Sequence, residues 1–155
     1  MRAPGTVTSY RYIRFHLTPD RSFLLMILPG GRRLYYPQPR LKMETTPWGA
    51  EREQITYMTR DSFTKKWMRV NTYGGKLTEN AVQAIARDML ATSMYKAEQA
   101  GLAVVLTVHD EIVAEVDADS PLGLSELTEI MTRPPNFAAG CPVAVEGYEG
   151  ERFAK

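Results

Sequence analysis

One stretch decides the fold, and it runs LAVVLTVHDEIVAEV over residues 102–116. Its first half, Leu102–Val108, is nearly all apolar and rich in β-branched side chains, which favour strands. After His109-Asp110 the stretch Glu111–Val116 alternates between its two sides, as a half-buried strand does. The sequence therefore predicts two strands joined by a tight polar turn at His109-Asp110.

A long helix is predicted immediately before this hairpin, over Thr78–Ala100. Thr78 is a suitable N-cap and Gly101 a suitable residue just beyond the C-terminus, whereas Gly74-Gly75 are expected to precede the helix. The apolar residues that recur at helical spacing predict one buried face. They are Ala81, Val82, Ile85, Ala86, Met89, Leu90, Met94 and Ala97.

The amino-terminal half reads as strands and turns. Strands are predicted at Tyr10–Phe15, Phe23–Leu28, Arg32–Tyr36, Glu53–Thr59 and Trp67–Thr72, with a Pro-Gly-Gly turn at 29–31 and a loop at 44–52. After the hairpin, a short helix at Pro121–Met131 and a last strand at Pro142–Glu146 are expected. Strands paired through hairpins, with one long and one or two shorter helices on one face, give an α+β fold in a single domain, residues 1–155.

Charge is distributed unevenly along the chain. Residues 1–76 hold 14 Lys/Arg and 5 Asp/Glu, whereas residues 77–155 hold 5 and 13. A basic half is typical of proteins with a phosphate-rich partner. The alternative is that the acidic half neutralises the basic half within one fold. A single cysteine fits a reducing cytoplasm, and no apolar run has the length of a membrane span, so no membrane association is expected.

Adjacent acids at the hairpin turn are the most informative chemical feature. A solvated turn is one explanation of Asp110 and Glu111, because turns tolerate aspartate well. The other is a carboxylate held rigidly at the end of a sheet to bind a hard cation such as Mg²⁺.

A family resemblance favours the second explanation. Val108-His109-Asp110-Glu111 followed by an apolar strand resembles motif C of the family A DNA polymerases, relatives of bacterial DNA polymerase I, of the phage and prophage type. In that family the motif lies at the tip of a palm hairpin. The resemblance implies that Asp110 is the metal ligand, Glu111 an accessory acid and His109 a residue near the primer terminus. It also implies a cytoplasmic location in a bacterial host.

Three other stretches support the resemblance, which covers the chain from about Phe23 to Lys155. Thr72–Asp88 resembles the long palm helix that lies beside the template–primer duplex, and Leu28–Pro37 and Glu146–Phe153 resemble the flanking hairpin and the carboxy-terminal end. The candidate DNA-binding residues are Lys76, Asn80 and Gln83 on the helix, and Arg40. For Asn80 and Gln83 an ordinary solvent-facing helix surface is the alternative.

Other parts of the family pattern do not occur in this sequence. The first catalytic motif supplies a second metal-binding aspartate, and no such string is present. Arg60, Lys65 and Tyr73-Gly74 approximate the nucleotide-gripping motif of the fingers, but their spacing is wrong and we assign them no such role. Asp110 and Glu111 would then supply half of a Mg²⁺ shell, and the isolated chain is expected not to polymerise DNA.

The expected partners follow from this incomplete site. They are a DNA template–primer, a second polypeptide carrying the missing motifs, and other copies of the chain that cover apolar palm surface. The alternative function is a non-catalytic nucleic-acid-binding or interaction module, a prophage remnant that grips phosphate through basic residues with aromatic ones among them. These are Arg32, Arg33, Arg40, Lys42, Lys65, Lys66, Arg69, Tyr35, Tyr36 and Trp67. A free-standing metal-dependent nuclease would need more clustered acids than this hairpin provides.

Overall fold

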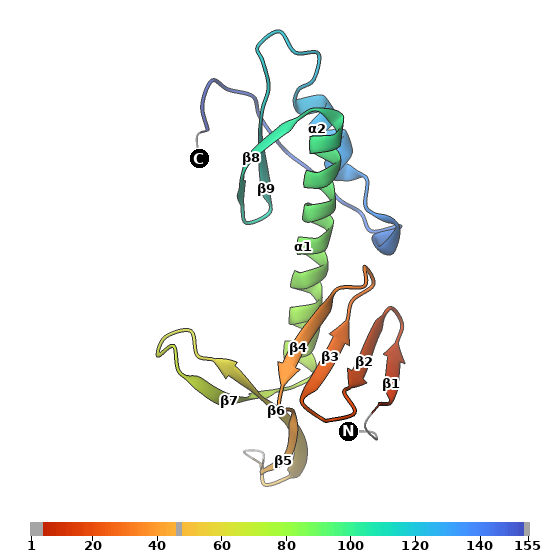
Figure 1. Cartoon of the computed structure of the whole chain (residues 1–155), viewed down its shortest axis with the longest axis vertical. Helices are drawn as coiled ribbons and strands as arrows, with labels where there is room; N and C mark the ends of the chain where they lie inside the picture. Colours follow the sequence, from red (N-terminus) through yellow and green to blue (C-terminus); the bar gives the residue numbers. More distant parts are fainter. Residues whose placement is uncertain (1–4, 46–47, 154–155) are drawn as a thin grey trace. The chain divides into compact units, whose positions relative to one another are not determined.

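The structure, a computed structural model, describes residues 5–45 and 48–153. It has the predicted α+β architecture, with antiparallel strands and one long and one short α-helix. The strands form three separate sheets, with orders β1-β2-β3-β4, β5-β6-β7 and β8-β9 (Figure 1). Contacts divide the chain into two compact units, residues 1–84 and 85–155, and the division falls inside the long helix. The first unit has 14 Lys/Arg against 6 Asp/Glu, and the second has 5 against 12.

The first sheet is a meander of strands β1 (Val7–Tyr10), β2 (Ile13–Leu17), β3 (Phe23–Ile27) and β4 (Arg33–Pro37). Its central strand β3 is apolar on both faces, which explains why Leu24, Leu25 and Met26 are all buried. Met26 pairs with Phe15 and Leu34 across the sheet. This strand is therefore the centre of the core in the first unit.

The predicted strand Tyr10–Phe15 is wrong, because a hairpin turn interrupts it. Tyr10 pairs with Ile13, so Arg11 and Tyr12 form the turn between β1 and β2. Arg11 adopts the left-handed conformation with φ 51°. A turn without Gly, Pro, Asn or Asp carries no compositional signal, so the break could not be seen in the sequence.

The second sheet contains β5 (Arg40–Thr45), β6 (Glu51–Arg60) and β7 (Trp67–Thr72). The predicted loop at 44–52 is too long at both ends, because β5 runs to Thr45 and β6 starts at Glu51. Residues 46–47 of this loop lie outside the residues that the structure describes. Tyr57 of β6 packs edge-on against Tyr36 of β4, with ring centroids 5.0 Å apart. One face of this sheet is therefore turned towards the first sheet.

Helix α1 (Gly74–Ala100) begins four residues before the predicted start. Leu77 N–H donates to Tyr73 O, and the Thr78 hydroxyl donates back to Gly74 O instead of capping the helix. A Cβ on Gly75 would lie 2.9 Å from the Tyr73 ring, so glycine permits this close approach in the first turn. At the other end Gly101 ends the helix as predicted, with φ 93°.

The buried face of α1 is narrower than the predicted one. Ala81 and Ala97 are buried, and Ile85, Met89, Leu90 and Met94 are partly covered. Val82 is 61% exposed and Ala86 is exposed as well, so the prediction is wrong at these two positions. Among the described helices none is long and apolar enough to cross a membrane.

In the second unit, strands β8 (Ala103–Val108) and β9 (Glu111–Glu115) form the predicted hairpin, and helix α2 spans Leu124–Thr132. The start of α2 is capped by carboxylates: Gly123 N–H donates to Glu126 Oε2 at 3.0 Å, and Leu124 N–H to Glu149 Oε1 at 2.6 Å. A short 3₁₀ turn follows at Asn136–Ala138. The predicted strand at Pro142–Glu146 is wrong, because these residues form no regular secondary structure.

The turn between β2 and β3 makes the stability of the fold depend on pH in the acid range. Hydrogen bonds from Thr18 and from the backbone and hydroxyl of Ser22 lower the pKa of Asp20 to about 2. A carboxyl whose pKa is lowered by folding stabilises the fold above its ordinary pKa of 3.8, and the contribution is lost as pH falls towards about 2. We expect Asp20→Asn to lose less thermal stability than wild type across this window. Equal decreases in the melting temperatures of the two proteins across this pH window would contradict this prediction.

Candidate active site

The β8–β9 hairpin presents the candidate catalytic residues at its tip. Val108 pairs with Glu111, so His109 and Asp110 alone form the turn. His109 has φ 54°, close to the 51° of Arg11 in the equivalent turn of the β1–β2 hairpin. The left-handed backbone of His109 is thus the ordinary geometry of a two-residue turn, which favours φ > 0 at its first position.

All three residues at the tip are exposed. Within residues 5–45 and 48–153, no hydrogen bond or ion pair engages the carboxylate of Asp110 or Glu111. Free carboxylate oxygens are the ligands that Mg²⁺ accepts, and it commonly takes only one or two of them from the protein. The tip therefore has the donor chemistry for such a cation.

The described part of the chain has no group of three or more His, Cys, Asp or Glu residues that could hold a metal ion. Glu111 belongs to strand β9, whereas Asp110 lies in the turn, so their side chains leave the backbone in different directions. The hairpin supplies a partial metal shell, and a complete one needs ligands from elsewhere.

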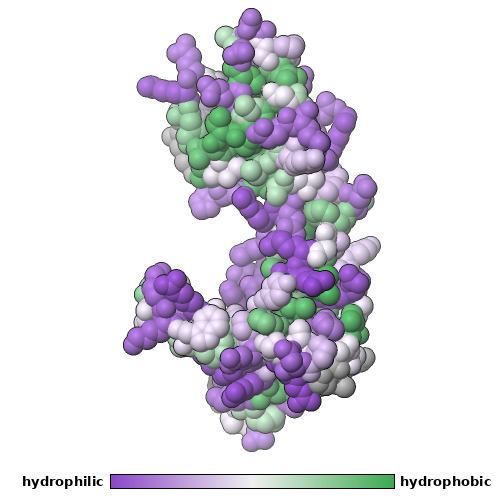
Figure 2. Space-filling model, viewed as in Figure 1, coloured by the Kyte–Doolittle hydropathy of each residue, from purple (hydrophilic) through white to green (hydrophobic). Residues whose placement is uncertain are grey.

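Apolar side chains are exposed on the same hairpin. Register shifts between Val104 and Leu106, which leaves Val105 in a bulge. Val105 is 57% exposed, Leu106 44% and Val116 40%. Figure 2 shows hydrophobic side chains gathered over this hairpin. A two-stranded sheet is only marginally stable by itself. Covering these exposed side chains with a further layer of protein would stabilise the hairpin.

The predicted DNA-binding residues of α1 lie together in its first turns, in the other unit. Glu79 connects two of them: Lys76 Nζ lies 3.1 and 3.0 Å from its carboxylate oxygens, and Gln83 Nε2 lies 3.5 Å from Oε1. The hydrogen bonds and charge of Glu79 raise the pKa of Lys76. Lys76 and Gln83 are exposed and remain accessible to a ligand, although Glu79 partly neutralises Lys76.

Asn80 has a structural partner that the sequence does not reveal. Its side-chain N–H donates to the Tyr36 hydroxyl at 3.1 Å, across 44 residues of chain. Burial raises the pKa of Tyr36, although the hydrogen bond from Asn80 acts to lower it. Asn80 is half-buried, and a DNA contact from it would compete with the bond to Tyr36. The fourth predicted residue, Arg40, is exposed on β5.

Comparison with known proteins identifies one informative relative. The chain is 40% identical over 139 residues to the DNA polymerase of Bacillus phage SP02. This chain is similar to a phage DNA polymerase. The match covers 88% of this chain but 20% of the phage polymerase, so the chain spans about a fifth of its relative. No family model matches the chain, and no solved structure matches it.

Proposed function

We propose that this chain is the carboxy-terminal palm portion of a family A DNA polymerase and that Asp110 is its metal-binding carboxylate. One observation carries the proposal: an exposed carboxylate without a partner in the described chain lies at a hairpin tip, in a sequence 40% identical to a phage DNA polymerase. A solvated turn would account for the exposure of Asp110, but not for the similarity around it.

The residues of the tip would act together on nucleotidyl transfer. Asp110 would hold Mg²⁺ through a carboxylate oxygen, with Glu111 assisting from the adjacent position. Bound metal supplies charge stabilisation to the attacking and leaving oxygens in such reactions. His109, whose left-handed backbone starts the turn, would contact the primer terminus. The two-residue turn and the first residue of β9 place all three side chains at the end of the hairpin.

Helix α1 would contribute the DNA contacts. Lys76 and Gln83 are exposed on its first turns and would approach the phosphate backbone and the base edges of a template–primer duplex. Glu79 lies between them, so DNA binding would have to separate Lys76 from this carboxylate.

A complete site would need a second set of ligands. Polymerases position two metal ions about 3.5–4 Å apart, and the hairpin offers only Asp110 and Glu111. We infer that another polypeptide segment carries the missing aspartate and covers the exposed apolar side chains of the hairpin and the residue after it, Val105, Leu106 and Val116.

Primer extension tests this proposal. The pure chain with Mg²⁺ and nucleotides should not extend a primer, and mixing it with the remainder of the phage SP02 polymerase should restore extension. Robust extension by the chain alone would contradict the incomplete site. Failure of the mixture, with both polypeptides folded and bound to each other, would contradict the polymerase assignment.

A non-catalytic nucleic-acid-binding role is the second candidate, and the excess of cations in the first unit favours it. Such a protein would bind nucleic acid with a steep salt dependence. The two candidates differ at Asp110, because only the polymerase role requires its carboxylate.

A further inference from the structure

The β5–β7 sheet sorts its charges by face. Residues paired across neighbouring strands point to the same side, and the register of this sheet is unbroken. In Glu51-Arg52-Glu53 the alternation therefore puts Arg52 on one face and both acids on the other. The same alternation holds for the other strands of the sheet. The face that carries Arg52, here called the basic face, therefore holds five cations: Arg40, Lys42, Arg52, Arg60 and Arg69.

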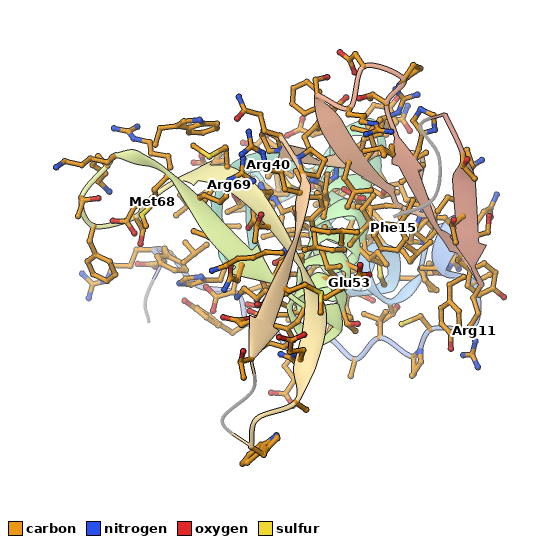
Figure 3. The ribbon with its side chains drawn as sticks, turned by 90° about the horizontal axis from the view of Figure 1, so that it is seen from below. Arg11, Phe15, Arg40, Glu53, Met68 and Arg69 are labelled. Carbon is orange, nitrogen blue, oxygen red and sulfur yellow. The ribbon has the colours of Figure 1, made fainter. Side chains whose placement is uncertain are left out.

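The basic face is covered at the middle of β6, where Gln54 and Thr56 are buried, and open around it, where Arg40, Lys42 and Arg52 are exposed. The opposite face includes Tyr57, which packs on Tyr36 of the first sheet, and the buried Thr72. Within the described strands, Glu44 is the one acid on the basic face, and it accepts a hydrogen bond from Asn71 at 3.3 Å. Five cations against one carboxylate leave an excess of positive charge on this face. Figure 3 labels two of the cations, Arg40 and Arg69, and Glu53 of the opposite face.

The five cations differ in how they are held. Arg69 is fixed by hydrogen bonds from Nη1 to Gln38 O at 2.9 Å and to the Thr56 hydroxyl at 3.1 Å. Arg60 donates from Nε to Lys65 O at 3.1 Å. Arg40, Lys42 and Arg52 are exposed, and no hydrogen bond or ion pair ties their side chains to the described residues. These three are available to an external anion.

An aromatic ring lies on the same face. Trp67, the first residue of β7, pairs with Arg60, so its side chain is on the basic face, and it is 58% exposed. The adjoining β6–β7 turn is largely hydrophilic (Figure 2). Cations that track a backbone, together with an aromatic ring on which a base can stack, are the two elements of single-strand binding. A duplex, whose bases are already stacked, would leave the ring unused.

We propose that the basic face binds single-stranded nucleic acid, with Arg40, Lys42 and Arg52 contacting phosphates and Trp67 stacking on a base. It is a second contact surface, separate from the template–primer contacts proposed for α1. This inference rests on the proposed function in one respect, namely that the bound polymer is a nucleic acid.

Fluorescence anisotropy of the full chain with a labelled oligothymidylate tests the phosphate contacts. We expect Arg40→Gln/Lys42→Gln/Arg52→Gln to weaken binding at least about tenfold. The slope of log affinity against log salt should become shallower by about 2, since each lost phosphate contact removes about 0.7. The matched control is Arg11→Gln/Arg14→Gln/Arg21→Gln, which removes three exposed arginines from the first sheet and its turns. Equal losses in both triple variants, or none in the first, would overturn the proposal.

Tryptophan emission tests the stacking contact. Trp48 and Trp67 are the two tryptophans of the sequence, so in a Trp48→Phe background the emission reports Trp67. Oligothymidylate should quench it saturably, and Trp67→Ala should weaken binding about tenfold, the order expected for one base–aromatic stack. Tighter binding of duplex without quenching would overturn the single-strand assignment.

The outcome can be separated from that of the polymerase proposal. Asp110→Asn should leave oligothymidylate binding unchanged, because the hairpin tip takes no part in it. If Asp110→Asn abolished oligothymidylate binding, the proposal that the basic face binds independently would be overturned, whatever the result of primer extension.

Discussion

Asp110→Asn should reduce primer extension by the reconstituted polymerase at least about 100-fold. The amide keeps the size of the side chain but removes the negative charge that a divalent cation needs. A lost metal ligand removes several kcal/mol of transition-state stabilisation, and about 2.7 kcal/mol already corresponds to 100-fold in rate. Single-turnover extension at saturating template–primer would measure the chemical step separately from DNA binding.

A matched variant makes this result specific. Asp117→Asn removes an exposed aspartate that follows β9 in the same unit, and it should leave the rate unchanged. Glu111→Gln should reduce the rate less than Asp110→Asn, as expected of an accessory acid. A rate for Asp110→Asn within a few-fold of wild type would show that the exposed turn is only a solvated turn.

Met26→Ala is expected to have the largest effect on folding, with a loss of about 2–5 kcal/mol in the free energy of unfolding. Met26 lies at the centre of β3 and is 1% exposed. It pairs with Phe15 on one side and Leu34 on the other, and their side chains cannot fill the space it leaves without moving the strands.

The same substitution on a strand of the second sheet provides the control. Met43 of β5 is 53% exposed, so Met43→Ala should change the free energy of unfolding by less than about 0.5 kcal/mol. Urea denaturation followed by circular dichroism measures both variants. Similar losses in the two would contradict the position of the core at β3.

The elements that the sequence predicted well are those with strong local signals. The β8–β9 hairpin has an apolar first strand and a polar turn, and Gly101 marks the end of α1 with a conformation that glycine adopts easily. The break at Arg11-Tyr12 and the strand Arg40–Thr45 have no comparable signal. Every residue of β5 is exposed or partly exposed, so its composition resembles that of a polar loop.

The same limit applies to the candidate site: features of a short stretch of sequence could be predicted, whereas contacts between distant residues could not. Asp110 became a candidate because adjacent acids at a turn are visible in the sequence and the segment resembles a polymerase motif, and its role stays a prediction. The bond between Asn80 and Tyr36 could not be predicted, because it joins residues 44 positions apart. Arg52 was not singled out at all, and Arg60 was considered only for the nucleotide-gripping motif that was rejected. Their place on the basic face depends on strand register, and the alternating signs of Glu51-Arg52-Glu53 become informative only when that segment is known to be a strand.

The most direct test of the central claim is to locate a bound divalent cation on the full chain by paramagnetic broadening with Mn²⁺ in the presence of template–primer. Mn²⁺ should broaden the amide signals of residues 109–111 first, and Asp110→Asn should abolish this effect. Broadening centred on other acidic residues, or unchanged in the Asp110→Asn variant, would contradict the claim.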